Sequence, residues 1–132
     1  MLGSSIRLVA GLQVKSSTIK AAGKGLYTAR PFKKGEKVAD YGGSVISQEQ
    51  YAKSPSGYGI HLNKDQILDG KSTQSGIGRY ANNCKTENKK KGECQGNNAR
   101  IIPNVRNKTA TIRATKGITK GTEIFVPYGR HY

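Results

Sequence analysis

Glycine interrupts this chain at short intervals and limits it to short elements of secondary structure. The 132 residues include 17 glycines and no tryptophan, and only 34% of them are hydrophobic. A chain of this length can bury one modest core but not two. So many turns around so lean a core predict a mostly β fold, and we expect a single domain spanning residues 1–132.

Short apolar stretches bounded by turn residues predict the individual elements. We expect strands at residues 6–14, 26–28, 37–41, 58–62 and 66–69, and a hairpin pairing 101–105 with 109–114. Ser47 and Gln50 have the spacing of a capping box, which predicts a short helix that Pro55 must end. Residues 85–98 are almost wholly Lys, Asn, Gly, Glu and Gln, a composition that predicts a mobile loop.

The chain is strongly basic. Lys and Arg outnumber Asp and Glu by 23 to 8, which gives a formal net charge of +15. A field of this sign favours a polyanionic partner, and nucleic acid, a nucleosome-like assembly or an anionic membrane surface would each satisfy it. The first residues lack the pattern of a secretory signal, and no stretch approaches the ~20 apolar residues that span a bilayer. We therefore expect an intracellular protein without a membrane segment.

Two cysteines, Cys84 and Cys94, lie ten residues apart in the basic stretch. A tetrahedral zinc site needs four ligands, and two cysteines without a nearby histidine do not supply them. We expect no bound metal and two free thiols, with a disulfide across the loop as the alternative.

Three separated segments carry a recognisable pattern. They are Gly23-Lys24-Gly25-Leu26-Tyr27, then Arg79-Tyr80-Ala81-Asn82-Asn83-Cys84, and finally Gly121-Thr122-Glu123-Ile124-Phe125-Val126-Pro127-Tyr128-Gly129. In this order and at these distances they resemble the SET-domain protein lysine methyltransferases, which use S-adenosylmethionine. The resemblance runs from about Lys20 to Tyr128. It implies the SET-domain fold, in which several small β-sheets with short helices surround a C-terminal pseudoknot.

The resemblance also implies a cofactor site for S-adenosyl-L-methionine. In the family the glycines let the backbone approach the methionine part of the cofactor, and Lys24 would lie against its carboxylate. The cofactor-binding residues implied in this way are Gly23, Lys24, Gly25, Tyr41, Arg79, Tyr80, Asn82 and Asn83. Asn83 occupies the position of a usual His. That His acts on the adenine largely through its main chain, and Asn has the same backbone donor and acceptor.

The catalytic residues implied are Tyr128 and Tyr58. Tyr128 matches the terminal SET tyrosine, whose hydroxyl would orient the amine and the methyl group. Tyr58, together with Tyr80, would form aromatic walls of the lysine channel, although packing in the core is an equal alternative for both. Val126 replaces an aromatic residue that the family links to the number of methyl groups added, so the methylation state does not carry over.

The family's usual substrate is a lysine in a protein, and we expect a basic tail, in particular a histone tail. Docking on DNA or a nucleosome through the basic surface would then raise the local concentration near that tail, in the nucleus or on chromosomes. One alternative is a catalytically impaired SET-like module that binds nucleic acid or chromatin. Another, an unrelated RNA-binding β-barrel, is disfavoured because two Phe and no Trp offer little base stacking.

Overall fold

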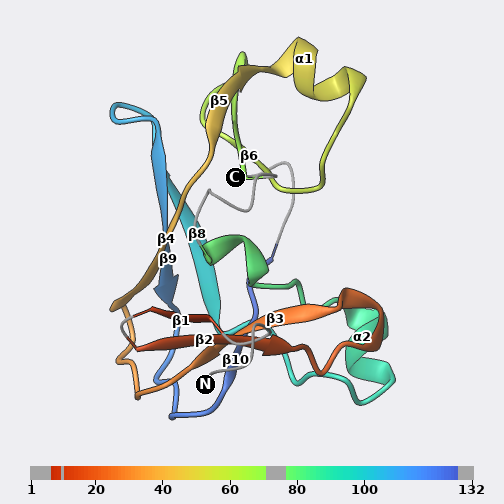
Figure 1. Cartoon of the computed structure of the whole chain (residues 1–132), viewed down its shortest axis with the longest axis vertical. Coiled ribbons are helices and arrows are strands. Elements are labelled where there is room, and N and C mark those ends of the chain that lie inside the picture. The colour runs from red at the N-terminus through yellow and green to blue at the C-terminus, as the bar shows by residue number, and fades with distance from the viewer. Residues whose placement is uncertain (1–6, 10, 71–76, 128–132) are drawn as a thin grey trace.

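The chain folds into three small antiparallel sheets joined by short helices, in a computed structural model that describes residues 7–9, 11–70 and 77–127 (Figure 1). The first sheet has the order β1 (Arg7–Val9), β2 (Leu12–Ser16), β3 (Lys24–Thr28), β10 (Glu123–Ile124). The second has the order β4 (Lys37–Tyr41), β9 (Thr109–Ala114), β8 (Ala99–Asn104). The third has the order β5 (Ser44–Ser47), β7 (Gln66–Asp69), β6 (Gly59–His61). The predicted mostly β fold of several small sheets is confirmed.

The helices are short, and the best defined of them begins where its capping box predicts. They are η1 (Lys20–Ala22), α1 (Gln48–Lys53), η3 (Gly78–Tyr80) and α2 (Thr86–Lys90). At the start of α1, the Gln50 N–H donates to Ser47 Oγ at 3.0 Å, and the Ser47 N–H donates to Gln50 Oε1 at 3.3 Å. The helix ends at Lys53, before Pro55, as expected.

Most predicted strands are present, but the first one is not continuous. Residues 37–41 and 66–69 form β4 and β7 with the predicted bounds. The expectation of one strand over residues 6–14 is wrong, because Gly11 adopts a positive φ of 79° and turns β1 back into β2. Val9 consequently pairs with Leu12 across this tight turn. The hairpin of β8 and β9 is confirmed, with Ala99 at its paired start.

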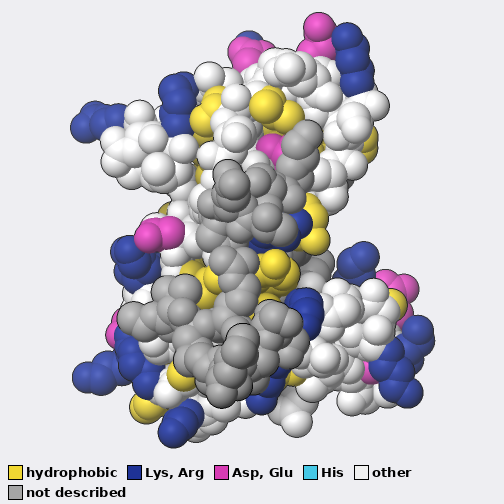
Figure 2. Space-filling view, viewed as in Figure 1, with side chains coloured by type: hydrophobic (Ala, Val, Ile, Leu, Met, Phe, Trp, Pro, Cys, Tyr) yellow, Lys and Arg dark blue, Asp and Glu magenta, His cyan; other side chains and the backbone are white. Residues whose placement is uncertain are grey.

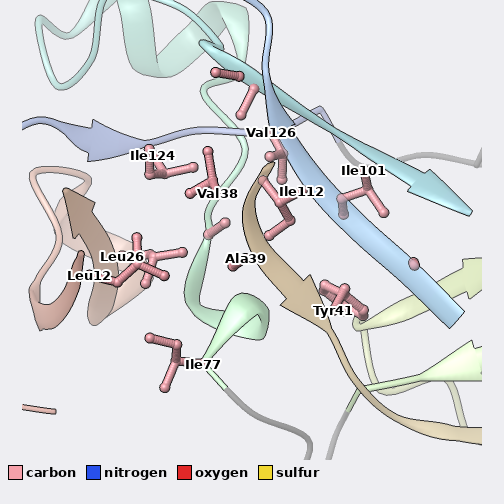
Figure 3. Close-up of a cluster of buried hydrophobic side chains, with 14 of the residues drawn as sticks. Leu12, Leu26, Val38, Ala39, Tyr41, Ile77, Ile101, Ile112, Ile124 and Val126 are labelled. Atoms are coloured by element: carbon pink, nitrogen blue, oxygen red, sulfur yellow. The ribbon is translucent and has the colours of Figure 1, made fainter. Parts of the chain in front are cut away.

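The main core joins side chains from all three sheets (Figure 3). Leu26 and Ile124 of the first sheet are fully buried, as are Ile101 and Ile112 of the second. Ile60 of β6 extends the cluster into the third sheet. Fully burying an Ile or Leu side chain contributes about 1.5–3 kcal/mol, so these contacts hold the small sheets together.

Residues 85–98 form more structure than their composition predicts. The loop prediction is wrong for residues 86–90, which form α2, and the prediction of two free thiols is wrong because Cys84 and Cys94 form a disulfide. Cys84 is buried against Ile19 and Phe125, with Cys94 packed beside them. This small apolar cluster is assembled from distant parts of the chain, which explains why the local composition did not indicate it. We call residues 85–94 the α2 wall.

Candidate cofactor and substrate site

The C-terminal segment passes between two asparagines from distant parts of the chain. Phe125 forms a parallel bridge with Asn82, and the Val126 N–H donates to Asn82 O at 2.8 Å. On the other side, the Phe125 N–H donates to Asn98 Oδ1, and Asn98 Nδ2 donates to Glu123 O, both at 2.9 Å. Residues 123–126 are therefore threaded between residues 82 and 98, which is the pseudoknot expected of the fold.

A buried carboxylate lies at the centre of this threading. Glu123 is only 5% exposed, yet its oxygens accept hydrogen bonds from Ser17 Oγ at 2.6 Å and from Thr18 N and Oγ1 at 2.9 Å. Tyr27 Oη donates at 3.1 Å and Asn82 Nδ2 at 3.4 Å. Such donors offset the cost of burying a charged group. We call Glu123 with these four partners the Glu123 knot.

The Glu123 knot raises the pKa of Tyr27 and requires a glycine at position 25. Burial raises the pKa of Tyr27 to about 12, with further contributions from the charge of Glu123 and the hydrogen bond to it. A Cβ at position 25 would overlap the Glu123 carboxylate, so only glycine fits there. Gly25 therefore has a packing role beyond the cofactor contact implied by the sequence resemblance.

Asn82 brings the first and second sequence motifs together. Its Nδ2 donates to the Lys24 carbonyl at 2.9 Å, while its own carbonyl accepts from Val126. Gly23 has a φ of 75° at the end of η1, a conformation that favours glycine. The Lys24 side chain is exposed. Asn82 thus holds the backbone of the glycine motif at Lys24.

A cavity of about 830 Å³ lies next to this junction. Its lining side chains come from four segments: residues 19–22, 56–58, 79–83 and 85–91. In Figure 1, residues 56–58 follow α1, and residues 19–22 lie beside α2. The volume falls in the range of ~300–1,000 Å³ that is usual for small-molecule sites. Of the residues predicted for the site, Tyr58, Arg79, Asn82 and Asn83 line this cavity.

Arg79 is clamped between two aromatic rings at the cavity. Its guanidinium carbon lies 4.3 Å from the centre of the Tyr58 ring and 5.3 Å from that of Tyr80. Its Nε donates to Gly70 O at 2.9 Å. Cation–π contacts of this kind favour one orientation of the guanidinium. Tyr80 packs against the main core and does not line the cavity, so of the two roles considered for it the structure supports packing.

The structure places Tyr41 behind the site. This side chain is 1% exposed and belongs to the main core, whereas the resemblance implied that it borders the cofactor. Its hydroxyl donates to Tyr58 O at 2.7 Å, so it supports the backbone of a lining residue. The other aromatic prediction, Tyr128, lies outside the described residues. Val126, two positions earlier, is fully buried.

Sequence reasoning missed the contribution of the α2 wall. Lys85, Glu87, Asn88 and Lys91 line the cavity, although the same stretch was expected to be a loop without an assigned role. The wall is held to the body by few contacts besides the disulfide, among them a 3.3 Å hydrogen bond from the Lys20 N–H to Glu93 Oε2. Only the alternative disulfide pairing gave any sequence signal that this stretch could be fixed.

Asn83 is held by Asn97, which follows the α2 wall in the chain. Its Oδ1 accepts from Asn97 Nδ2 at 3.3 Å, while Asn97 Oδ1 accepts from the Cys84 N–H at 2.9 Å. Three cations, Arg79, Lys85 and Lys91, and one carboxylate, Glu87, line the same cavity. This combination of charges and amides suits a ligand that carries both an acidic and a basic group.

Two other kinds of site do not occur within residues 7–9, 11–70 and 77–127. No group of three or more His, Cys, Asp and Glu side chains there is arranged to hold a metal ion. No helix in the same part of the chain is long and apolar enough to cross a membrane.

Comparison with known proteins identifies the family. The SET domain model matches residues 23–129. A solved structure of a humanized mutant of the Chaetomium thermophilum Polycomb Repressive Complex 2, bound to the inhibitor GSK126, superposes with a TM-score of 0.69 and 23% identity. The match covers 89% of this chain but only 15% of that chain, and it shows a shared fold. A search of curated proteins found no match. The family model covers all three sequence motifs, and the chain belongs to the SET-domain family.

Proposed function

We propose that this protein is an S-adenosylmethionine-dependent protein lysine N-methyltransferase. The observation that carries the proposal is the cavity of about 830 Å³ where Tyr58, Arg79, Asn82 and Asn83 meet beside the glycine motif. A ligand-sized cavity with a few convergent polar groups is the usual form of a binding site. Membership of the SET-domain family supports the same activity.

The residues around the cavity fit the chemistry of S-adenosylmethionine. Arg79, Lys85 and Lys91 offer cations to its carboxylate, and Glu87 offers an acceptor to its amino group. Asn83 offers amide and backbone groups to the adenine. When bound, the cofactor supplies an electrophilic methyl group carried on a sulfonium. The remaining predicted residues have two roles. The backbone of Gly23, Lys24 and Gly25 approaches the cofactor, and the Tyr80 ring helps to orient Arg79.

The chain's task toward the substrate is to hold a neutral lysine amine in line. A lysine with a normal pKa of ~10.4 is protonated at neutral pH, a penalty of roughly 4–5 kcal/mol for the reactive form. Enclosing the lysine tip between aromatic side chains such as Tyr58 and Tyr128 lowers its pKa, and the proton leaves to water. The Tyr128 hydroxyl orients the amine. Positioning of this kind lowers the barrier by several kcal/mol.

For the substrate we propose a histone tail. The chain carries a formal charge of +15, so a basic tail does not attract it directly. Docking on nucleic acid or on a nucleosome beside the tail overcomes this repulsion, because the basic surface then works in favour of the encounter. A nuclear or chromosomal location follows from that choice of substrate.

Calorimetric titration with S-adenosylmethionine tests the cavity directly. Ala22 lines the cavity and is exposed, so Ala22→Trp would fill the space without removing a core contact. We expect this variant to lose at least about tenfold in affinity, because the indole occupies ligand volume. The matched control is Ala52→Trp, which places the same side chain on the exposed face of α1, away from the cavity. Its affinity should equal that of the parent.

The chemical step is tested separately with Tyr128→Phe. This variant should bind S-adenosylmethionine like the parent but transfer methyl groups to histone peptides at a strongly reduced rate. Absence of cofactor binding to the parent protein would overturn the proposal and favour the impaired basic module. Equal binding loss in both Trp variants would contradict the assignment to this cavity.

A further inference from the structure

Three cations lie side by side on the outer face of the sheet formed by β4, β9 and β8. The register pairs Arg113 of β9 with Lys37 of β4 on one side and with Arg100 of β8 on the other. Directly opposed side chains on neighbouring strands share one face, with Cβ atoms ~4.5–5.5 Å apart. Lys37 and Arg100 are exposed and Arg113 is half-buried. We call these three residues the basic row.

The basic row is poorly neutralised by the protein itself. Like charges directly opposite each other destabilise a sheet. Asp40 pairs with Lys37 at 3.1 Å, and Arg113 donates to Gly35 O at 3.1 Å. Among the residues that the structure describes, no carboxylate forms an ion pair with Arg100 or Arg113. The opposite face of the same strands is apolar and packs into the core, so the positive charge is directed outward.

Further exposed cations lie in the segments that lead into β4 and out of β9. Lys33 and Lys34 are exposed in the turn before β4, and Lys116 is exposed after β9. Figure 2 shows Lys and Arg side chains along the lower left edge of the molecule, over the turns that lead into β4 and out of β9 in Figure 1. The positive surface therefore extends beyond three residues.

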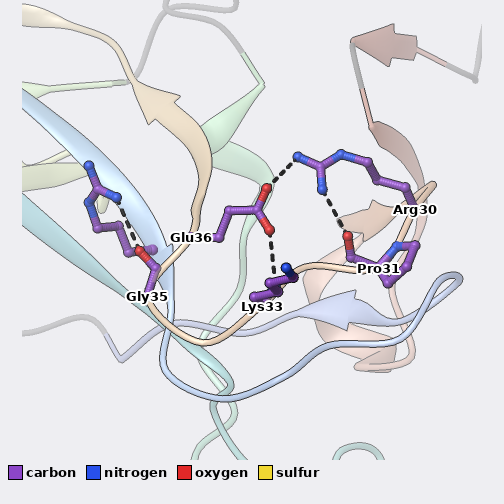
Figure 4. A network of polar contacts seen from close by, with 6 residues as sticks. Arg30, Pro31, Lys33, Gly35 and Glu36 are labelled. Carbon is purple, nitrogen blue, oxygen red and sulfur yellow. Dashed lines mark hydrogen bonds and ion pairs between the residues drawn. The ribbon is translucent and has the colours of Figure 1, made fainter.

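The acidic residue in the first of these turns is engaged locally. The Glu36 carboxylate accepts from Arg30 Nη2 and from the Lys33 N–H, both at 2.9 Å (Figure 4). These contacts lower the pKa of Glu36, with the Lys33 backbone N–H as the largest cause. Glu36 thus fixes the turn and pairs with Arg30, while the basic row keeps its charge.

We propose that the basic row binds the phosphate backbone of duplex DNA without reading its sequence. This assignment rests on the nucleic-acid contact proposed above and identifies the protein surface that makes it. It does not depend on methyl transfer. The outward positions beside the row include Thr111 and Ile102, and Tyr41 is turned into the core. Within the described strands this face therefore lacks the aromatic side chains on which single strands stack. It also lacks the aromatic anchors typical of protein interfaces.

The first test compares two variants with equal loss of charge. Lys37→Gln/Arg100→Gln removes two cations from the row, whereas Lys53→Gln/Lys64→Gln removes two exposed cations from α1 and the turn after β6. Arg113 is kept because its contact with Gly35 belongs to the fold. Binding to a short mixed-sequence duplex is measured by fluorescence anisotropy over a range of salt concentrations. Each lost phosphate contact should reduce the slope of log K against log salt by about 0.9.

We expect the row variant to bind the duplex roughly tenfold more weakly near physiological salt and to lose about 1.8 from the slope. The control variant should keep nearly the full slope. Equal losses in both variants would overturn the assignment to this face while leaving the nucleic-acid contact intact. No duplex binding by the parent would overturn the contact itself, and preference for single-stranded DNA would exclude the duplex assignment.

A second comparison predicts a gain. Asp40→Asn frees Lys37 from its ion pair and should strengthen duplex binding, because one more cation faces the phosphates. Asp65→Asn changes the net charge equally, in the exposed turn before β7. A gain limited to Asp40→Asn supports the proposal, and an equal gain in both would contradict it. Circular dichroism of all variants checks that the fold is retained.

Discussion

Two regions meet at the proposed cofactor site and are held together very differently: the Glu123 knot, of which Asn82 lines the cavity, and the α2 wall. In the Glu123 knot, the hydrogen bonds to Ser17, Tyr27 and Asn82 join residues that are 106, 96 and 41 positions apart. In the α2 wall, Asn88 bonds to Glu93 only five positions away, and the disulfide bridges ten. Long-range contacts therefore hold the knot, whereas the α2 wall is a small unit attached to the rest of the chain at few points. The cavity is thus bordered by Asn82, which long-range contacts hold, and by the α2 wall, which we expect to loosen independently.

The largest expected effect comes from breaking the knot. Glu123→Ala leaves several buried donors without an acceptor, so we expect a loss of roughly 3–5 kcal/mol in the free energy of unfolding. Urea denaturation measures it. The matched control is Glu87→Ala in the exposed α2 wall, which should change stability by less than about 0.5 kcal/mol. Similar losses in the two variants would contradict the contrast between the two regions.

The disulfide provides the next largest effect. Cys84→Ser/Cys94→Ser removes a crosslink of ten residues, which should cost about 3 kcal/mol if the wall unfolds with the rest of the protein. If the wall loosens alone, as its few contacts suggest, the loss appears as faster trypsin cleavage after Lys85, Lys89 or Lys90. Mass spectrometry of the fragments distinguishes the two cases. Unchanged cleavage in this stretch would show that the wall does not depend on the disulfide.

Alkaline pH offers a more graded test of the knot. The pKa of Tyr27 is raised from 10.0 to about 12, so between these values the unfolded chain has lost a proton that the folded chain retains. Stability should therefore fall as pH rises through this window, by roughly 2–3 kcal/mol, and this contribution should be constant below pH ~10. Tyr27→Phe removes that component. Parallel stability curves for parent and variant between the two pH values would refute the assignment.

The smallest effect lies outside both regions and gives a reference for a local contact. Ser47→Ala removes the side-chain cap of α1 and should cost about 1 kcal/mol. Ser47→Thr keeps a capping hydroxyl and should cost less. Thermal unfolding of both variants measures the difference. A cost for Ser47→Ala as large as that of Glu123→Ala would remove the distinction between local and long-range contacts.

Local patterns were sufficient to predict much of this fold. The capping box at Ser47, the apolar bodies of residues 37–41 and 66–69, and the hairpin ending at Ala114 all appear in the structure. In each case the signal lies within a few consecutive residues. The turn at Gly11 was missed because its position inside an apolar stretch did not reveal its positive φ.

The candidate site was less predictable because its contacts are distant in sequence. The family motifs indicated Arg79, Asn82 and Asn83, which do line the cavity. No local pattern indicated that Glu123 binds Ser17 or that Ile19 and Phe125 bury the Cys84 side chain. Those pairings depend on the folded arrangement of segments about a hundred residues apart, so composition alone made residues 85–98 look like a loop.

The pairing of β3 with β10 has a consequence for the order of events during synthesis. Leu26 emerges early from the ribosome but must wait for Ile124, its partner in the sheet, until almost all of the described chain has been made. Contacts over such separations form slowly because loop closure must precede them. The Lys24 carbonyl and Asn82 can meet earlier, but the buried acceptor that joins them arrives with Glu123. The contacts that fix Asn82 beside the proposed cofactor site are therefore complete only after residue 123 has been made.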